Sequence, residues 1–279
     1  MKASDRELIS RRDKLRRENM IRNAVVLAEG CLKHRDAIGP RVDIRSLAFD
    51  CGVTDIVLRP MRVPAVLTRE EERWIIAVDS RSPQGPERVR FSIAHELAHL
   101  LLRQSPNAPS EGTVALRGGP SSQVESVCDE IAARILMPES AFVSHAGTFG
   151  WSLGGVHSLA SRFETSITAT ALRLSKLHPE PCALTFWSLR NMTSWNRLLP
   201  AWTVTNDRHT GGRIDIVPRP GMDPLPTVRS AAHTADLATG TEQVREGRRG
   251  RVMERYTEAR RFGKGDGAFV LTLTHLDKM

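Results

Sequence analysis

The feature that most constrains this chain is a pair of histidines inside an apolar segment. His95 and His99 are four positions apart, with Glu96 between them, in the run from residue 90 to 102. Because residues four apart lie on one face of an α-helix, a helix here directs both imidazoles towards one point. Glu96 is about a quarter turn away from His95, so it faces the open side of that point. This spacing predicts a zinc peptidase site with Glu96 as general base.

The apolar surroundings of the pair argue against a chance match. Residues 90–102 have the pattern of a largely buried helix, and ionisable groups that are buried without partners are costly. A chance occurrence would fall more often in a loop or a polar stretch. A metal ion supplies the partner that two histidines and a glutamate need there, so the sequence favours the catalytic interpretation.

A catalytic zinc ion usually takes three protein ligands and one water, so the pair predicts a third ligand. Glu125 is the best candidate, because it lies in residues 124–136, where apolar residues recur at helical spacing. Asp129 is one turn further on the same face and can accept a hydrogen bond from a ligand histidine. Glu130 is off that face, and Cys128 is interpreted as a small buried hydrophobic residue. The ordinary alternative for Glu125 is a solvated helix carboxylate.

These two segments resemble a known family. Residues 88–102 and residues 125–138, which end in a Met-Pro pair, are similar to the matching segments of the ImmA/IrrE family of metallo-endopeptidases. With weaker flanking similarity, the resemblance extends over about residues 40–178. It implies a gluzincin-like site whose three zinc ligands and catalytic base are His95, His99, Glu125 and Glu96.

One position departs from the family pattern, because Asp129 stands where many members have asparagine. Both side chains accept hydrogen bonds. The departure therefore affects the basicity and orientation of a ligand histidine and leaves the ligand set unchanged. Nitrogen and oxygen ligands accept several divalent ions, which makes manganese the alternative to zinc in the cell.

The resemblance also implies a function. It implies a zinc-dependent endopeptidase that cleaves a helix-turn-helix transcriptional repressor and so derepresses stress-response, DNA-damage-response or mobile-element genes. The alternative is a non-hydrolytic, metal-containing regulatory protein that binds a repressor or DNA. The retained Glu96 argues against that alternative, because a purely structural metal site has no need of a base beside an open position.

The patterning of the chain and the resemblance together predict an α+β fold in three parts. Residues 1–150 are expected to form a zincin-like metallopeptidase domain, with an N-terminal helix, a small antiparallel sheet and the active-site helices. Residues 151–178 indicate two short helices that resemble a helix-turn-helix unit, with the turn at 164–166. The second helix offers only Arg173 for reading DNA bases, which favours a packing role. Residues 179–279 indicate a mixed α/β domain, similar to the GAF-type sensor domain of longer stress-response members.

Shorter elements are expected before the histidine pair. Residues 42–48 predict a short helix opened by Asp43. Strands are expected at 55–61, 65–68 and 74–78. By resemblance, the last of these lines the cleft and pairs with an extended substrate. An ordinary core strand is the equal alternative from the sequence itself.

The positive charge of the chain is concentrated in two clusters. The net charge is +8, and basic residues gather in residues 1–35 and between Arg245 and Arg261. Such clusters can mark nucleic-acid contact. Acidic residues are interleaved in both, which favours solvated helix faces over direct nucleic-acid binding. No apolar run is long enough to span a membrane, and the N-terminus lacks a signal core, so we expect a cytosolic protein.

Several residues are left without a catalytic role. The four scattered cysteines contain no CxxC pair and predict reduced thiols. Residues 103–123 are rich in Ser, Pro and Gly and are expected either to rim the cleft or to be disordered. Tyr256 and His145 are too weakly indicated to be assigned as oxyanion donors. His157 and His178 are expected to be surface or capping residues.

Overall fold

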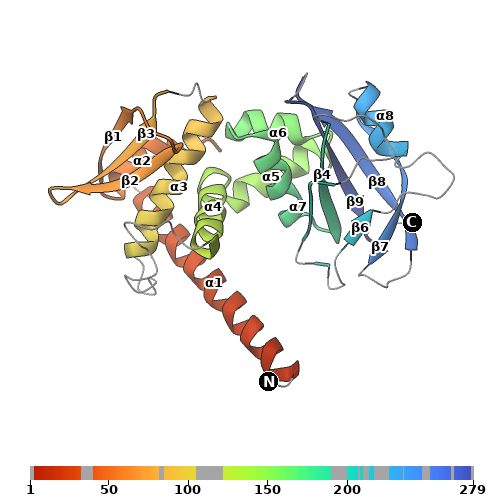
Figure 1. Ribbon diagram of the computed structural model, residues 1–279, viewed down its shortest axis with the longest axis horizontal. Helices are drawn as coiled ribbons and strands as arrows, with labels where there is room; N and C mark the ends of the chain where they lie inside the picture. Colours follow the sequence, from red (N-terminus) through yellow and green to blue (C-terminus); the bar gives the residue numbers. More distant parts are fainter. Residues whose placement is uncertain are drawn as a thin grey trace. The chain divides into compact units, whose positions relative to one another are not determined.

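The computed structural model divides the chain into two compact units. It describes residues 3–32, 40–81, 85–104, 122–189, 200–206, 208–209, 214–216, 226–234, 236–246, 252–264 and 267–277. The first unit comprises Met1–Ala141 with Arg162–Thr165, and the second comprises Phe142–Ser161 with Ser166–Met279. The elements are helices and two β-sheets (Figure 1), which confirms the predicted mixed α+β class. Among the described residues, no helix is both long enough and apolar enough to cross a membrane.

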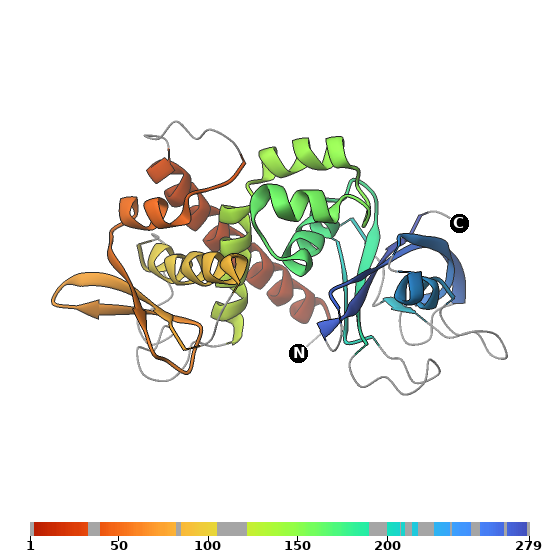
Figure 2. The same cartoon turned by 90° about the horizontal axis from the view of Figure 1, so that it is seen from above.

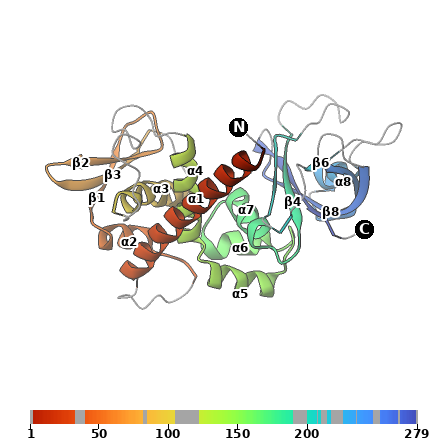
Figure 3. The same cartoon turned by 90° about the horizontal axis from the view of Figure 1, so that it is seen from below.

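The first unit is built on packed helices. These are α1 (Ala3–Leu32), α2 (Ile44–Asp50), α3 (Pro86–Gln104) and α4 (Ser122–Leu136). The predicted N-cap of α2 is confirmed, because Oδ1 of Asp43 accepts a hydrogen bond from Ser46 N at 3.2 Å. Side chains such as Leu97, Leu101 and Ile131 are wholly buried in the core that α3 and α4 share with α1. Figure 3 shows α1 crossing α3 and α4.

A three-stranded sheet completes the first unit and lies beside α3 (Figure 2). Its strands are β1 (Val53–Arg59), β2 (Ala65–Glu70) and β3 (Arg73–Asp79), in the order β1-β3-β2. β3 is antiparallel to β2 but parallel to β1, so the predicted antiparallel sheet is wrong and the sheet is mixed. The reason is the apolar run Ile75–Val78, which is buried and therefore takes the central position, between β1 and its own hairpin partner.

The second unit contains most of α5 (Glu139–Phe149) and α6 (Val156–Phe163) and all of α7 (Ile167–Leu177) and α8 (Pro226–Thr234). Its antiparallel sheet has the order β5-β4-β9-β8-β7-β6. The strands are β4 (Cys182–Ser188), β5 (Trp202–Thr205), β6 (Ile214–Ile216), β7 (Ala238–Glu246), β8 (Val252–Phe262) and β9 (Phe269–His275). The strands predicted in β4, β6 and β9 are confirmed, as are the two short helices α6 and α7. The sequence did not indicate α5 or α8.

Helices cover both faces of this sheet. Val228 and Ala231 of α8 share a core cluster with Ala259 of β8 on one face. Because strand residues alternate between faces, Glu258 belongs to the opposite face. There it accepts a hydrogen bond at Oε2 from Leu153 N, at 2.9 Å, in the turn between α5 and α6.

Two glycines shape the turn between α5 and α6. Gly150 has a φ of +94°, which side-chain-bearing residues rarely adopt. At Gly155, a Cβ atom would lie 2.6 Å from the carbonyl oxygen of Phe149. The turn can therefore fold tightly against the sheet only because both positions lack a side chain.

The expectation of a helical face for the second basic cluster is wrong. Its described residues lie in the strands β7 and β8, where charged side chains on both faces conceal the strand alternation. Arg260 Nη1 donates to the Gly154 carbonyl at 2.8 Å, and Arg261 Nη1 donates to the Ala232 carbonyl at 3.0 Å. These two side chains therefore stabilise the fold through hydrogen bonds to backbone carbonyls. Arg248, Arg249 and Arg251 lie outside the described residues, as do positions 105–121 of the expected cleft rim.

Candidate metal centre

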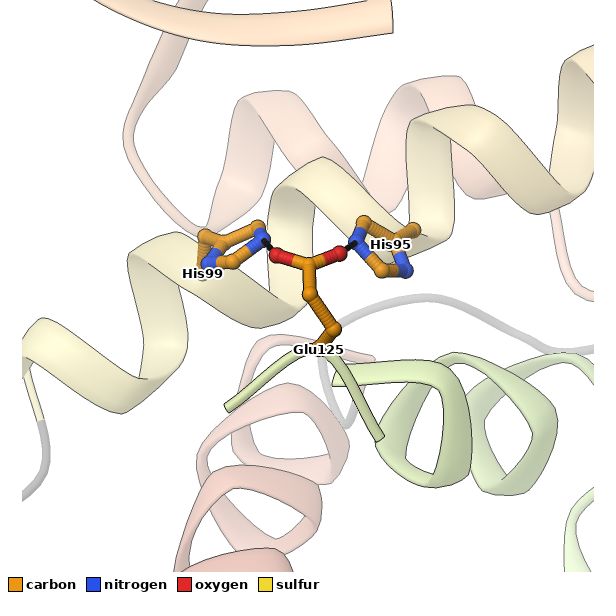
Figure 4. A group of neighbouring side chains, drawn as sticks. All are labelled: His95, His99 and Glu125. Atoms are coloured by element: carbon orange, nitrogen blue, oxygen red, sulfur yellow. Dashed lines mark hydrogen bonds and ion pairs between the residues drawn. The ribbon is translucent and has the colours of Figure 1, made fainter. Parts of the chain in front are cut away.

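Helices α3 and α4 bring together the three residues that the sequence predicts as metal ligands. His95 and His99 project from α3, and Glu125 projects towards them from the first turn of α4 (Figure 4). Nε2 of His95 is 3.1 Å from Oε2 of Glu125, and Nε2 of His99 is 3.4 Å from Oε1 of Glu125. One ligand atom from each residue lies within 4.8 Å of the others. The three side chains thus converge on one point.

The spacing and chemistry of these donors fit a small divalent cation. Zinc bonds of about 2.0–2.2 Å place the donors of a tetrahedral ion roughly 3.3–3.6 Å apart, and the separations of 3.1 and 3.4 Å are close to that. Nδ1 of His95 is 2.9 Å from Oδ1 of Asp129. A carboxylate only accepts, so Nδ1 carries the proton of this hydrogen bond. When Nε2 is unprotonated, the ring directs a lone pair at the Glu125 carboxylate, and a bound cation removes this repulsion.

Helix α4 also orients both imidazoles through their second ring nitrogens. Asp129 holds Nδ1 of His95, as expected, and Cys128 Sγ is 3.4 Å from Nδ1 of His99. Cys128 is fully buried, and burial raises the pKa of its thiol far above the ordinary range, so it stays protonated. The interpretation of Cys128 as a buried residue is confirmed. Its contact with His99 could not be predicted, because such a contact follows from the packing of two helices.

Burial is the largest influence on the protonation of both imidazoles. It lowers the pKa of His99 to about 4, together with the charge of His95, so this ring is neutral as a ligand must be. Burial also acts to lower the pKa of His95, but the hydrogen bond to Asp129 and the charge of Glu96 raise that pKa on balance. Metal binding at His95 therefore competes with a proton.

Glu96 is held beside the cluster by the backbone of β2. Its Oε2 accepts a hydrogen bond from Leu67 N at 2.8 Å. Burial raises the pKa of Glu96, while the nearby charge of His95 opposes the rise. A carboxylate with a raised pKa is a stronger base than an ordinary one. The hydrogen bond from Leu67 N to Glu96 could not be predicted from the sequence, because a backbone N–H is present at almost every position.

The strand that was predicted to pair with a substrate does not have a free edge. β3 is hydrogen-bonded to β1 and β2 on its two sides, so the alternative of a core strand is the correct one. β2 is the edge strand of the described sheet on the side where Leu67 meets Glu96. Backbone groups alternate in an antiparallel pair, so Ala65 and Arg69 face the same edge as Leu67.

The remaining sequence candidates lie elsewhere. Glu130 Oε1 accepts from Nε of Arg134 at 3.0 Å, in an ion pair on α4. His157 is exposed, as expected, whereas His178 is the C-cap of α7 but is buried. Tyr256 lies on β8, and the oxyanion role stays unassigned.

Part of the chain is similar to known proteins. Residues 42–175 match the family described as the IrrE N-terminal-like domain. The chain is similar to the Radiation response metalloprotease IrrE of Deinococcus radiodurans, with 33% identity over 113 residues, which are 40% of this chain and 34% of that protein. It is also similar to the protein of the same name from Deinococcus deserti, with 31% identity over 121 residues, which are 41% and 42% of the two chains. The chain therefore matches 34% and 42% of the length of these two curated relatives.

A solved structure shares the fold at lower sequence identity. A Mycobacterium tuberculosis transcriptional regulator is similar over 92% of this chain and 76% of its own, with a TM-score of 0.54 and 14% identity. At that identity the similarity shows the fold alone. The sequence matches, in contrast, confirm the resemblance to the ImmA/IrrE family.

Proposed function

We propose that this chain, which belongs to the ImmA/IrrE family through residues 42–175, is a zinc-dependent endopeptidase. The observation that carries the proposal is the convergence of His95, His99 and Glu125 on one point, with the half-buried Glu96 alongside. We assign the first three as metal ligands, Glu96 as the catalytic residue and Asp129 as a positioning residue. The curated relatives are named metalloproteases, which supports a peptidase with a protein substrate. Zinc is preferred for this donor set, with manganese as the alternative ion.

The chain's own residues supply the proton transfers of peptide hydrolysis. When bound, the metal ion would act as a Lewis acid, polarising the peptide carbonyl and making water a stronger acid. Glu96 is tied to Leu67 through Oε2, so Oε1 is the oxygen that takes a proton from the attacking water. Glu96 then returns this proton to the leaving amide nitrogen. His95 and His99 are held in place by Asp129 and Cys128.

The edge of β2 is the proposed binding surface for the peptide substrate. An extended peptide can add a strand to a sheet edge through main-chain hydrogen bonds. The backbone groups of Ala65, Leu67 and Arg69 face this edge, and Leu67 N places it at Glu96. A peptide paired there would run past the carboxylate that serves as the base.

The finer functional assignments rest on the family resemblance. We propose a helix-turn-helix transcriptional repressor as the protein substrate, and derepression of stress-response or mobile-element genes as the outcome. The helices α6 and α7 are proposed to be a helix-turn-helix-like pair with a packing role. The second unit, whose core is an antiparallel sheet between helices, is proposed to be a GAF-like sensor.

Cleavage of a repressor tests this proposal. The purified chain with added zinc is incubated with the helix-turn-helix repressor encoded next to its gene, and the fragments are identified by mass spectrometry. We expect cleavage at a defined bond. Glu96→Gln should retain zinc and slow cleavage by about a hundredfold to ten-thousandfold, the usual contribution of a general base.

The matched control is Glu87→Gln, an exposed glutamate in the first turn of the same helix, which should cleave at the normal rate. Cleavage by Glu96→Gln at the normal rate would contradict the assigned base. If Glu96→Gln activates the target genes as well as the unmodified chain does, the protein acts by binding and the peptidase proposal fails.

A further inference from the structure

The second unit contains a pocket that the peptidase site does not use. Its volume is about 670 Å³. It lies on the face of the sheet that carries Glu258, beneath the turn between α5 and α6. The side chains that matter for its chemistry come from that turn, from the connection between α7 and β4, and from the strands β8 and β9. They are Trp151, His178, Glu180, Tyr256, Glu258 and His275.

His178 is a fully satisfied structural residue of this pocket. Its Nδ1 accepts a hydrogen bond from Glu180 N at 3.0 Å, and its Nε2 is 3.2 Å from the carbonyl oxygen of Trp151. Nε2 therefore carries the proton and donates to that carbonyl, which makes the ring neutral. Burial lowers the pKa of His178, in agreement with a neutral ring. This side chain ties two parts of the pocket wall together.

His275 has the opposite character. It is only 5% exposed, yet neither of its ring nitrogens has a hydrogen-bond partner among the described residues. The nearest polar atoms are carboxylate oxygens, with Glu180 Oε2 at 3.5 Å from Nδ1 and Glu258 Oε1 at 3.6 Å from Nε2. Buried polar groups are nearly always hydrogen-bonded, so an exception that lines a pocket calls for an explanation. A bound molecule that places a donor beside the unprotonated nitrogen of this ring would provide one.

The aromatic side chains of the pocket are in successive contact, and their rings are turned relative to one another by 78°, 74° and 48°. The ring centroids of Trp151 and His178 are 5.9 Å apart, those of His178 and His275 are 5.3 Å apart, and those of His275 and Tyr256 are 5.4 Å apart. Aromatic faces attract cations through the quadrupole of the ring. Planar cations such as guanidinium also stack on such faces.

The charges of the lining have the sign that a cation requires. Glu180 and Glu258 contribute two carboxylates, and the lining that the structure describes contains no lysine or arginine. Arg260 does not line the pocket, and its Nη1 donates to the carbonyls of Leu153 and Gly154. Oε2 of Glu258 is engaged by Leu153 N, so Oε1 is the atom on the side of His275.

We propose that this pocket binds a small organic cation with a planar head rich in N–H groups, of the guanidinium or amidinium class. Its N–H groups would donate to Glu258, Glu180 and the unprotonated ring nitrogen of His275, while its plane stacks on one aromatic face, that of Trp151 or Tyr256. Paired N–H donors match a carboxylate in a two-pronged geometry that an ammonium group cannot reproduce. The proposal does not depend on peptidase activity.

Two probes of the same shape and different charge test this inference. The full chain is titrated with N-butylguanidine and with N-butylurea, and binding is followed by calorimetry and tryptophan fluorescence. We expect the guanidine to bind and the neutral urea to bind at least about tenfold more weakly, as for the loss of a charged hydrogen bond. Trp151→Phe should remove the fluorescence response at this site.

Charge-neutralising variants locate the binding. Glu258→Gln keeps an acceptor for Leu153 N and should weaken guanidine binding about tenfold. Glu180→Gln, at a side chain that is 42% exposed, should weaken it without threatening the fold. The control is Glu254→Gln, an exposed glutamate on the same strand that does not line the pocket. Equal binding of both probes, no binding of the guanidine, or an unchanged affinity in both pocket variants would overturn the inference.

Discussion

The two units of this molecule each contain two histidines beside carboxylates, but the ring nitrogens are satisfied differently. In the first unit, His95 and His99 both contact Glu125 through Nε2. Their Nδ1 atoms are held by Asp129 and Cys128. Each ring thus has one nitrogen to orient it and one nitrogen directed at a shared point. This division is what a metal ligand needs.

In the second unit, the two histidines have separate tasks. His178 uses both nitrogens in hydrogen bonds within the protein, whereas His275 uses neither. The carboxylates of Glu180 and Glu258 flank this ring at 3.5 and 3.6 Å, each on a different ring nitrogen, so the three groups do not converge on one point. Residue types alone therefore do not distinguish a candidate metal centre from a candidate pocket for an organic cation. The two are distinguished by the partners of the second ring nitrogen of each histidine.

Removing the shared carboxylate of the first unit should have the largest effect. Glu125→Gln removes the anionic ligand, and we expect the zinc affinity to fall by more than about a hundredfold, beyond the loss usually caused by changes behind the ligands. Competition against a chromophoric chelator measures this affinity. Glu139→Gln, an exposed glutamate in the next helix, is the control. Guanidine binding in the second unit should be unchanged, and full zinc occupancy in Glu125→Gln would refute the ligand assignment.

Removing Asp129 would make His95 resemble His275. Asp129→Ala leaves Nδ1 of His95 without its partner at 2.9 Å, and the zinc affinity should fall by about tenfold to a hundredfold. Asp129→Asn retains an oxygen acceptor and should bind zinc nearly as well as the unmodified chain. The same chelator competition separates the two variants. An alanine variant with normal affinity would show that orientation of His95 is unimportant.

The smallest effect is expected for the free energy of unfolding when the two histidines of the second unit are replaced in turn. His178→Phe leaves the Glu180 N–H and the Trp151 carbonyl without partners, and should lower the free energy of unfolding by about 1–3 kcal/mol. His275→Phe breaks no hydrogen bond with the described residues and should cost less than about 1 kcal/mol. Urea denaturation of the two variants measures the difference. Equal losses would mean that His275 has structural partners after all.

The convergence of the candidate metal ligands could be predicted because its determinants are local. His95 and His99 are set by the period of one helix, and Glu125 lies in the first turn of the next described helix. The N-cap Asp43 was predictable for the same reason, since a cap depends on a few consecutive residues. The contact of Leu67 N with Glu96 was not predictable, because it depends on which strand lies at the sheet edge.

The pocket of the second unit could not be predicted, because its determinants are distant in sequence. Trp151 and His275 are far apart in the sequence of that unit. They line one pocket only because β8, β9 and β4 pair in the sheet. The strand β8 was itself missed, because Arg255 and Glu258 place charges on both faces and hide the alternation that marks a strand. Arg260 is an example of such a charged strand residue: its guanidinium donates hydrogen bonds to backbone carbonyls of the same unit.

The most direct test of the central claim is to locate the ion itself. Crystals grown with excess zinc are measured at the zinc absorption edge, and an anomalous difference map is calculated. We expect a strong peak at about 2.0–2.2 Å from Nε2 of His95, Nε2 of His99 and a carboxylate oxygen of Glu125. A peak that leaves Glu125 outside coordination distance, or a zinc ion bound elsewhere with these three side chains empty, would contradict it.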